Sequence, residues 1–257
     1  MDDPDVPAVS RRDVLSLSAA ALAGAVPLAV PSWPVAPALA AAAPSQVHGP
    51  TAGVSPSEDL MREHGVLKGI LLVYREGIRR VQRGERVPAQ ALHAAARVVH
   101  DFVELHHECL EEKYVFPRLR EAGRLRRTVA VLHRQHWRGR DLTRRILAVT
   151  RGPGVSARDR RTLVSDMAAF VRMYEPHEAR EDTVVFPVFR RLTPARELAR
   201  LGEVFRAEEY RRFGPHGFTT VVREVADIER ALHIYGLDQY TPPKTARHHR
   251  RRGPRAR

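Results

Sequence analysis

Two stretches of the sequence bring histidine and carboxylate side chains together in nearly the same order. Residues 106 to 117 have the sequence HHECLEEKYVFP, and residues 177 to 187 have the sequence HEAREDTVVFP. Aligned on His107 and His177, both stretches place a glutamate four residues later, at Glu111 and Glu181, without a gap. Residues four apart lie on the same face of a helix, one turn along, so each stretch predicts a pair of side chains suited to ligate a metal ion.

A further histidine precedes each of these pairs. His64 lies 43 residues before His107, and His136 lies 41 residues before His177. Two helical hairpins related by a pseudo-twofold axis would bring the four histidines and two glutamates together inside a helical bundle. Bundle proteins hold pairs of metal ions with inward-facing Glu and His side chains of this kind.

The cost of burying charge favours metal ions at such a site. An unpaired ionised carboxylate in an apolar core costs several kcal/mol, so buried carboxylates are expected to be paired or to bind cations. Two glutamates offset about half the charge of two divalent ions, which leaves room for a bridging oxo or hydroxo group, or for Glu108 or Glu178 as an additional ligand. The alternative is a solvent-exposed helix face with ordinary pairing of residues four apart, with His64 and His136 as core or surface histidines.

Other polar residues near these motifs are expected to support the site. His100, His106 and His133 are interpreted as structural residues or as partners of the ligands. Glu104 and Tyr174 lie three residues before the two pairs, where they would either hydrogen-bond the ligands or fill space.

The composition limits the kind of metal and the kind of chemistry. The chain has 257 residues, 43% of them hydrophobic, and a single cysteine, Cys109. An internal disulfide framework and a cysteine-rich zinc site are therefore excluded, and His, Asp and Glu ligands suit iron, manganese or zinc. No Ser/His/Asp or Cys/His nucleophile set is evident, which argues against a hydrolase.

The periodicity predicts an all-α protein, an up-down-up-down four-helix bundle with two additional C-terminal helices. We expect the first helix to begin at Ser57 and to end before Gly84, and we expect the remaining helices over about 88–123, 125–150, 156–192, 195–213 and 217–236. Pro117 and Pro187 are expected to kink or end their helices.

Both ends of the chain differ in composition from this bundle. Arg11-Arg12, a weakly apolar stretch broken by prolines, and Ala38-Leu39-Ala40 resemble a twin-arginine export signal, which predicts an extracytoplasmic protein. The expected division is 1–44 for the signal, 45–56 for a linker, 57–193 for the bundle, 194–238 for the helical extension and 239–257 for a basic tail. The formal net charge is +13, and seven Lys and Arg residues lie in the last fourteen positions. We expect a solvated tail, with contact to an anionic surface as the alternative and no specific nucleic-acid binding.

At the motifs HHECLEEKYVFP and EPHEAREDTVVFP, with the histidines upstream, the sequence resembles the hemerythrin-like HHE cation-binding family over about 58–192. The resemblance implies a four-helix bundle with a non-haem centre of two iron ions, or of manganese or zinc. The ligands that it implies are His64, His107, Glu111, His136, His177 and Glu181, with the two glutamates as bridges.

Oxygen-carrying hemerythrins have a fifth histidine ligand and an aspartate bridge, whereas this chain has His133 three residues before His136, and Glu181 in place of the aspartate. These departures argue against reversible oxygen carriage, with His133 as an alternative fifth ligand. The leading interpretation is an exported di-iron protein that binds oxygen, nitric oxide or peroxide, or that senses or stores iron. The alternatives are an oxidase or peroxidase-like enzyme and a metal-free helical interaction module.

Overall fold

The computed structural model describes residues 54–86 and 88–243. The predicted export signal, nearly all of the predicted linker and most of the basic tail lie outside the described residues. Within the described ranges the secondary structure is helical, with no strand. The predicted all-α class is therefore confirmed.

The first helix, α1 (Pro56–Gln82), begins one residue earlier than the sequence suggested. Ser55 is the N-cap: its hydroxyl accepts from the Glu58 amide, and the Glu58 carboxylate accepts from the Ser55 amide in return. This reciprocal capping box, with Pro56 in the first turn, sets the start of the helix more strongly than Ser57. Gly84, at φ +69°, lies just after the helix ends.

The second helical segment runs as a nearly continuous helix from residue 89 to residue 121. It comprises α2 (Ala89–Val98), the wide π-helical turns η1 (Val99–His107) and η2 (Glu111–Val115), the short α3 (Glu108–Leu110) between them, and α4 (Phe116–Glu121). Gly123 follows with φ +69°, in the left-handed region that glycine adopts without strain.

The third and fourth helical segments form the second half of the bundle. The third is α5 (Arg126–Thr150), and the fourth joins α6 (Ala157–Arg180), the π-helical turn η3 (Glu181–Val185) and α7 (Phe186–Leu192). Ser156 caps α6 by accepting from the Asp159 amide.

Neither of the two Phe-Pro prolines ends its helix. Pro117 and Pro187 occupy the first turns of α4 and α7, each directly after a π-helical turn. A proline in the first turn of a helix costs little because the amide hydrogen that it lacks would have had no partner within the regular helix. The wide turns of η2 and η3 each contain one of the predicted ligand glutamates, and π-helical turns are common at functional sites.

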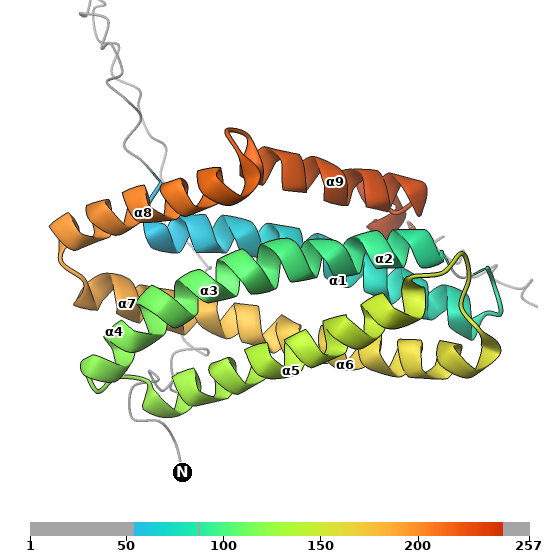
Figure 1. Cartoon of the computed structure of the whole chain (residues 1–257), viewed down its shortest axis with the longest axis horizontal. Coiled ribbons are helices and arrows are strands. Elements are labelled where there is room, and N and C mark those ends of the chain that lie inside the picture. The colour runs from blue at the N-terminus through green and yellow to red at the C-terminus, as the bar shows by residue number, and fades with distance from the viewer. Residues whose placement is uncertain (1–53, 87, 244–257) are drawn as a thin grey trace, which may run out of the picture. The chain divides into compact units, whose positions relative to one another are not determined.

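These helical segments, whose arrangement Figure 1 shows, pack around two apolar cores. Contacts join α1 to α2, α2 to α5, α5 to α6, and α6 back to α1, which closes a ring of neighbours. One core surrounds Tyr74 and Phe170, and the other surrounds Phe116 and Phe189. The buried histidines and carboxylates described below belong to neither apolar cluster.

Two further helices, α8 (Ala195–Phe213) and α9 (Gly217–Ala231), lie along α1 and α2 (Figure 1). A Cβ atom at Gly69 of α1 would lie 2.6 Å from Val225 of α9, so this helix crossing needs a glycine. The last helix ends at Ala231, not near residue 236 as predicted, because His233 takes φ +58° and Ile234 donates back to the Glu229 carbonyl. A short 3-10 turn, η4 (Leu237–Tyr240), follows.

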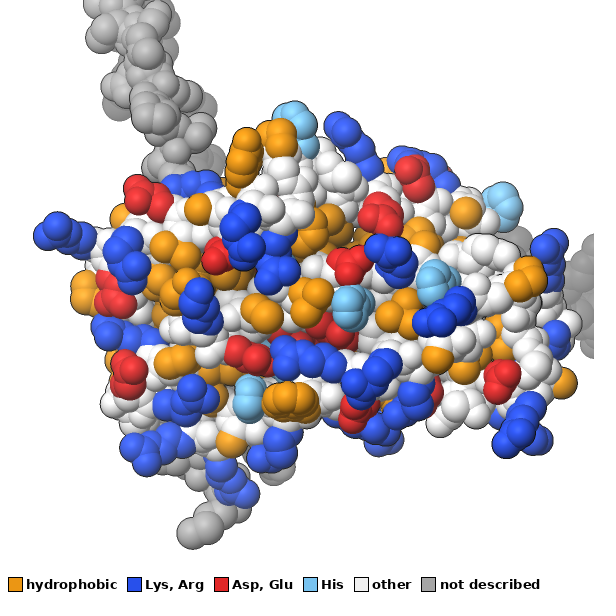
Figure 2. Space-filling model, in the orientation of Figure 1, with side chains coloured by type: hydrophobic (Ala, Val, Ile, Leu, Met, Phe, Trp, Pro, Cys, Tyr) orange, Lys and Arg blue, Asp and Glu red, His pale blue; other side chains and the backbone are white. Residues whose placement is uncertain are grey.

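The surface of the described residues is charged and mixed. Figure 2 shows Lys and Arg side chains spread over the face in view, with fewer Asp and Glu among them. Among the described helices, none is both long and apolar enough to span a bilayer.

Candidate metal centre

The structure brings the six predicted ligand residues together between the helices. Their ligand atoms form two groups, within each of which all atoms lie within 4.8 Å of one another. We call the group of His64, His107, Glu111 and Glu181 the first position, and the group of His136, His177, Glu111 and Glu181 the second position. Both glutamates belong to both groups, as expected of bridging residues.

All six side chains are buried. Glu111, Glu181 and His136 have no measurable exposure, and the other three histidines are at most 4% exposed. The alternative of a solvent-exposed helix face is therefore wrong. Neither carboxylate has a hydrogen-bond partner for either oxygen within the described part of the chain. Unpartnered buried carboxylates are costly, so this arrangement fits a metal site better than a structural one.

The four imidazoles direct the same ring nitrogen toward the glutamates. Nε2 of His107 lies 3.4 Å from Glu111 Oε1, and Nε2 of His136 lies 3.4 Å from Glu111 Oε2, so the two oxygens of Glu111 face different positions. On the other side, Oε2 of Glu181 lies 3.5 Å from Nε2 of His64 and 3.1 Å from Nε2 of His177. Six nitrogen and oxygen donors thus converge without a thiolate, a set that suits iron, manganese or zinc.

The other nitrogen of each ring, Nδ1, donates a hydrogen bond to a side chain outside the two positions. His107 Nδ1 lies 2.8 Å from Glu63 and His64 Nδ1 lies 2.8 Å from Asp182. In the second position, the corresponding partners are Glu112 for His136 and Gln135 for His177, each at 2.9 Å. The three carboxylates and the amide oxygen of Gln135 can only accept here, so these bonds hold the hydrogen on Nδ1 and leave the Nε2 lone pair of each neutral ring toward the glutamates.

One contact within the first position indicates that a cation belongs between its two imidazole rings. Nε2 of His64 and Nε2 of His107 lie 3.1 Å apart. With both Nδ1 atoms protonated, two neutral rings would set lone pair against lone pair. Either a proton or a metal cation between the rings relieves this repulsion.

The histidine pKa values reflect the same surplus of negative charge. Burial opposes the protonation of His64, but the hydrogen bond to Asp182 and the nearby Glu181 carboxylate outweigh it and raise the pKa of His64 to about 9. Burial also opposes the protonation of His136, and the nearby Glu108 and Glu111 raise its pKa to about 10. The buried cluster therefore attracts positive charge, which protons or metal ions can supply.

The three residues considered as additional ligands lie outside both positions. Glu108 accepts a hydrogen bond of 2.6 Å from Tyr174 and pairs with Arg140 at 2.9 Å, while Glu178 pairs with Lys68 at 2.6 Å. His133 is half-buried and its ring contacts Trp137. Glu108 and His136 also form a third group with Glu112, but Arg140 already supplies its cation.

The residues predicted to support the site differ in whether they contact its ligands or their neighbours. His106 is buried and shares Glu63 with His107, through a bond of 3.1 Å, and Tyr174 holds Glu108. His100 is exposed and lies 2.7 Å from the carboxylate of its neighbour Asp101. Glu104 is buried with one oxygen unpartnered, and burial raises the pKa of Glu104 to about 7.

The sequence analysis missed the four side chains that hold the imidazoles. They are Glu63, Glu112, Gln135 and Asp182, and each is the immediate chain neighbour of a predicted ligand. This adjacency could have revealed them, because it occurs in both halves of the repeat. A polar residue precedes each upstream histidine, and an acidic residue follows each ligand glutamate.

Comparison with known proteins agrees with this geometry. The sequence of residues 55–189 matches the hemerythrin HHE cation binding domain. The chain belongs to this family. It is also 50% identical over 238 residues to uncharacterised proteins of Mycobacterium tuberculosis and Mycobacterium bovis, an overlap that covers 91% of this chain and 92% of each relative. No solved structure matches the chain.

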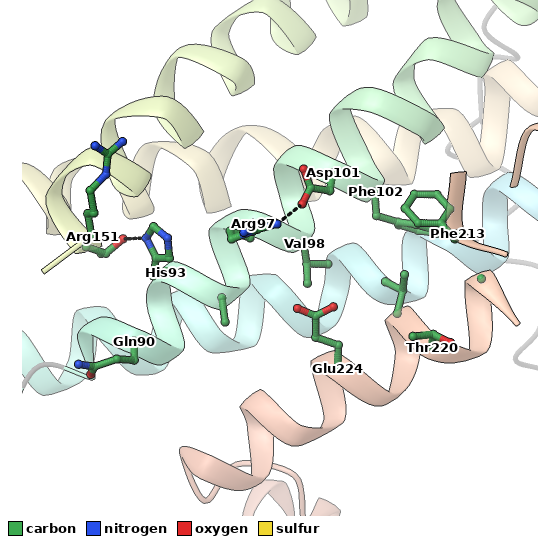
Figure 3. Close-up of a pocket in the computed structure, with 14 residues that line it drawn as sticks. Gln90, His93, Arg97, Val98, Asp101, Phe102, Arg151, Phe213, Thr220 and Glu224 are labelled. Carbon is green, nitrogen blue, oxygen red and sulfur yellow. Dashed lines mark hydrogen bonds and ion pairs between the residues drawn. The ribbon is translucent and has the colours of Figure 1, made fainter. Parts of the chain in front are cut away.

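A separate cavity lies away from the metal centre, where α2 faces α9 (Figure 3). It has a volume of about 480 Å³, and none of the six residues lines it. Val98 and Val221 form part of its apolar wall, while Arg97 pairs with Asp101 at its edge.

Proposed function

We propose that this chain binds two iron ions at the six residues of the two positions and that this centre binds a small ligand such as oxygen, nitric oxide or peroxide. Manganese and zinc are the alternative metals. The observation that carries the proposal is the orientation of the imidazoles: four Nδ1 atoms are held by outer side chains, while four Nε2 atoms face two carboxylates that have no other partner. Metal-bound histidines are held in this way by their second nitrogen.

The burial of the site supports the proposed size of the ligand. Because every residue of the two positions is at most 4% exposed, a ligand of two or three atoms fits this environment better than a larger substrate. When bound, iron would supply redox chemistry and coordination positions. The protein would orient the imidazoles, balance the charge with Glu111 and Glu181, and exclude bulk water.

The proposal includes the up-down-up-down arrangement of the four helical segments. Short connections between consecutive segments and the ring of contacts among α1, α2, α5 and α6 support it. The proposal also includes export by the twin-arginine route, supported by Arg11-Arg12 and the apolar stretch that follows. Replacement of both arginines by lysine in a fusion of residues 1–45 to a reporter should abolish export, and unchanged export would refute this part.

Elemental analysis with an optical spectrum tests the metal and its ligand. We expect about two iron atoms per chain and an absorption spectrum that changes on addition of oxygen, nitric oxide or peroxide. A change that reverses on deoxygenation favours a carrier, and catalytic turnover of added peroxide favours the enzyme alternative. A protein purified without metal that also fails to bind added ferrous iron under anoxic conditions would refute the proposal and favour the metal-free module.

A further inference from the structure

The two halves of the centre are alike in geometry but not in charge. Glu63 precedes His64 and Gln135 precedes His136, and each accepts from the Nδ1 atom of a histidine in its own half, at 2.8 Å for His107 and 2.9 Å for His177. The two acceptors occupy equivalent places. One is a carboxylate and the other a neutral amide.

A second difference also leaves more negative charge beside the first position. Glu112, which holds His136, also lies 2.7 Å from the guanidinium of Arg140. The equivalent acceptor in the first position is Asp182, which holds His64, and among the described residues no lysine or arginine pairs with it. Lys68, four residues after His64 as Arg140 is four after His136, pairs with Glu178 instead.

The first position is therefore supported by two carboxylates with which no described lysine or arginine pairs, although His106 also bonds one of them, Glu63, at 3.1 Å. The second is supported by one amide and by Glu112, with Glu108 further away at 4.0 Å from His136 Nδ1, and both of these carboxylates pair with Arg140. A carboxylate on the far side of an imidazole raises the basicity of the nitrogen that faces the metal, and the loss of such a partner typically weakens metal binding about 10- to 100-fold.

We infer that the two positions are not equivalent: the position of His64 and His107 binds a divalent cation at least about 10-fold more tightly than the position of His136 and His177. The inference rests on the proposed function, because it concerns the same six residues. It makes Glu63 and Gln135 the residues that set the order of loading. With one equivalent of metal, the protein then contains mainly a single species, loaded at the first position.

Two stepwise constants measured on the intact site would not test this inference. The second cation is repelled by the first even in a symmetric site, so unequal steps arise without any difference between the positions. Each position has to be measured alone. His136→Ala/His177→Ala in the full-length chain leaves only the first position, and His64→Ala/His107→Ala leaves only the second.

The experiment is a titration of each metal-free double variant with Zn²⁺ against a chromophoric chelator, with circular dichroism to verify folding. We expect the first position to bind at least about 10-fold more tightly. Added to the first-position variant, Glu63→Gln should weaken binding about 10- to 100-fold, and added to the second-position variant, Gln135→Glu should strengthen it. Glu203→Gln, an exposed change on α8, is the matched control and should alter neither. Affinities within about threefold of each other, or no effect of Glu63→Gln, would overturn the inference.

A measurement on the unmutated chain covers the case in which a double variant does not fold. With ¹⁵N-labelled histidine and substoichiometric Zn²⁺, which is diamagnetic and mainly shifts the nitrogens that bind it, the Nε2 signals of His64 and His107 should change before those of His136 and His177. Simultaneous changes in all four signals would overturn the inference while leaving the metal site intact. Failure of the proposed function is distinguishable, because it would leave all four signals unchanged at every Zn²⁺ concentration.

Discussion

Removal of metal should lower the stability of this protein, and the six residues should differ in how much of that stability they control. Glu111 and Glu181 belong to both positions, whereas each histidine belongs to one. A change at a shared glutamate should therefore remove the metal-dependent stability of both positions. A change at a single histidine should remove that of one.

The size of the effect follows from binding to the folded state alone. At a free metal concentration 100 times the dissociation constant of the weaker position, that position stabilises the fold by about 2.7 kcal/mol, so two positions contribute at least about 5.4 kcal/mol. For a domain of this size, each kcal/mol shifts the melting temperature by about 2–4 °C, which gives about 10–20 °C for the fully loaded protein. His64→Ala, which removes the tighter position, should retain less than half of this shift, and Glu111→Gln should retain almost none.

The assay is thermal unfolding followed by circular dichroism, with and without Zn²⁺ or anoxic Fe²⁺, for the unmodified chain and for each variant. The relevant quantity is the metal-induced shift within one variant, which separates metal binding from the direct effect of the mutation on the metal-free fold. Glu203→Gln should keep the full shift. If Glu111→Gln also kept the full shift, Glu111 would not be a shared ligand and the two-position geometry would be refuted.

Three further changes test the surroundings of the centre. Gly139→Ala should destabilise the fold by about 1–3 kcal/mol, because the new Cβ atom would clash with the Tyr174 ring, whereas Gly65→Ala has open space and should not destabilise it in the same denaturant titration. Tyr174→Phe should cost about 1–3 kcal/mol in chemical unfolding, since it removes a donor from buried Glu108. Burial raises the pKa of Glu104 to about 7, above its usual 4.5, so the folded state retains a proton that the unfolded chain releases and stability falls as the pH rises between these values. Glu104→Gln should remove this fall, at most about 3 kcal/mol, and an unchanged pH profile of unfolding would contradict the assignment.

The helices were largely predictable from local signals. Gly84 and Gly123 follow the ends of two helices, and Ser156 caps the start of another. At these positions, contacts between neighbouring residues in the sequence determine where the helix begins or ends. The errors arose where two local signals competed. Ser55 outweighed Ser57 because it forms a reciprocal capping box, and Pro117 did not end its helix because the preceding π-helical turn places it at the start of a new α-helical segment.

The candidate ligands were recognisable because each repeat places two of them four residues apart on one helix. Their hydrogen-bond partners were not, since those bonds join different helices. The bond of His64 to Asp182 spans 118 residues of sequence, and that of His136 to Glu112 joins the second and third helical segments. Periodicity gives the face on which a side chain lies, but it does not give the rotation of neighbouring helices that decides which polar residue meets which ring nitrogen.

The pattern of these bonds explains why the repeat forms one centre and not two. Each upstream histidine is held by the acidic residue that follows the glutamate of the opposite half: His64 by Asp182, and His136 by Glu112. Each position also takes one glutamate from the opposite half. A single hairpin would therefore lack both a ligand and an orienting partner, so neither half could form a complete position until the two halves pack together, and metal binding should be coupled to the assembly of the whole bundle.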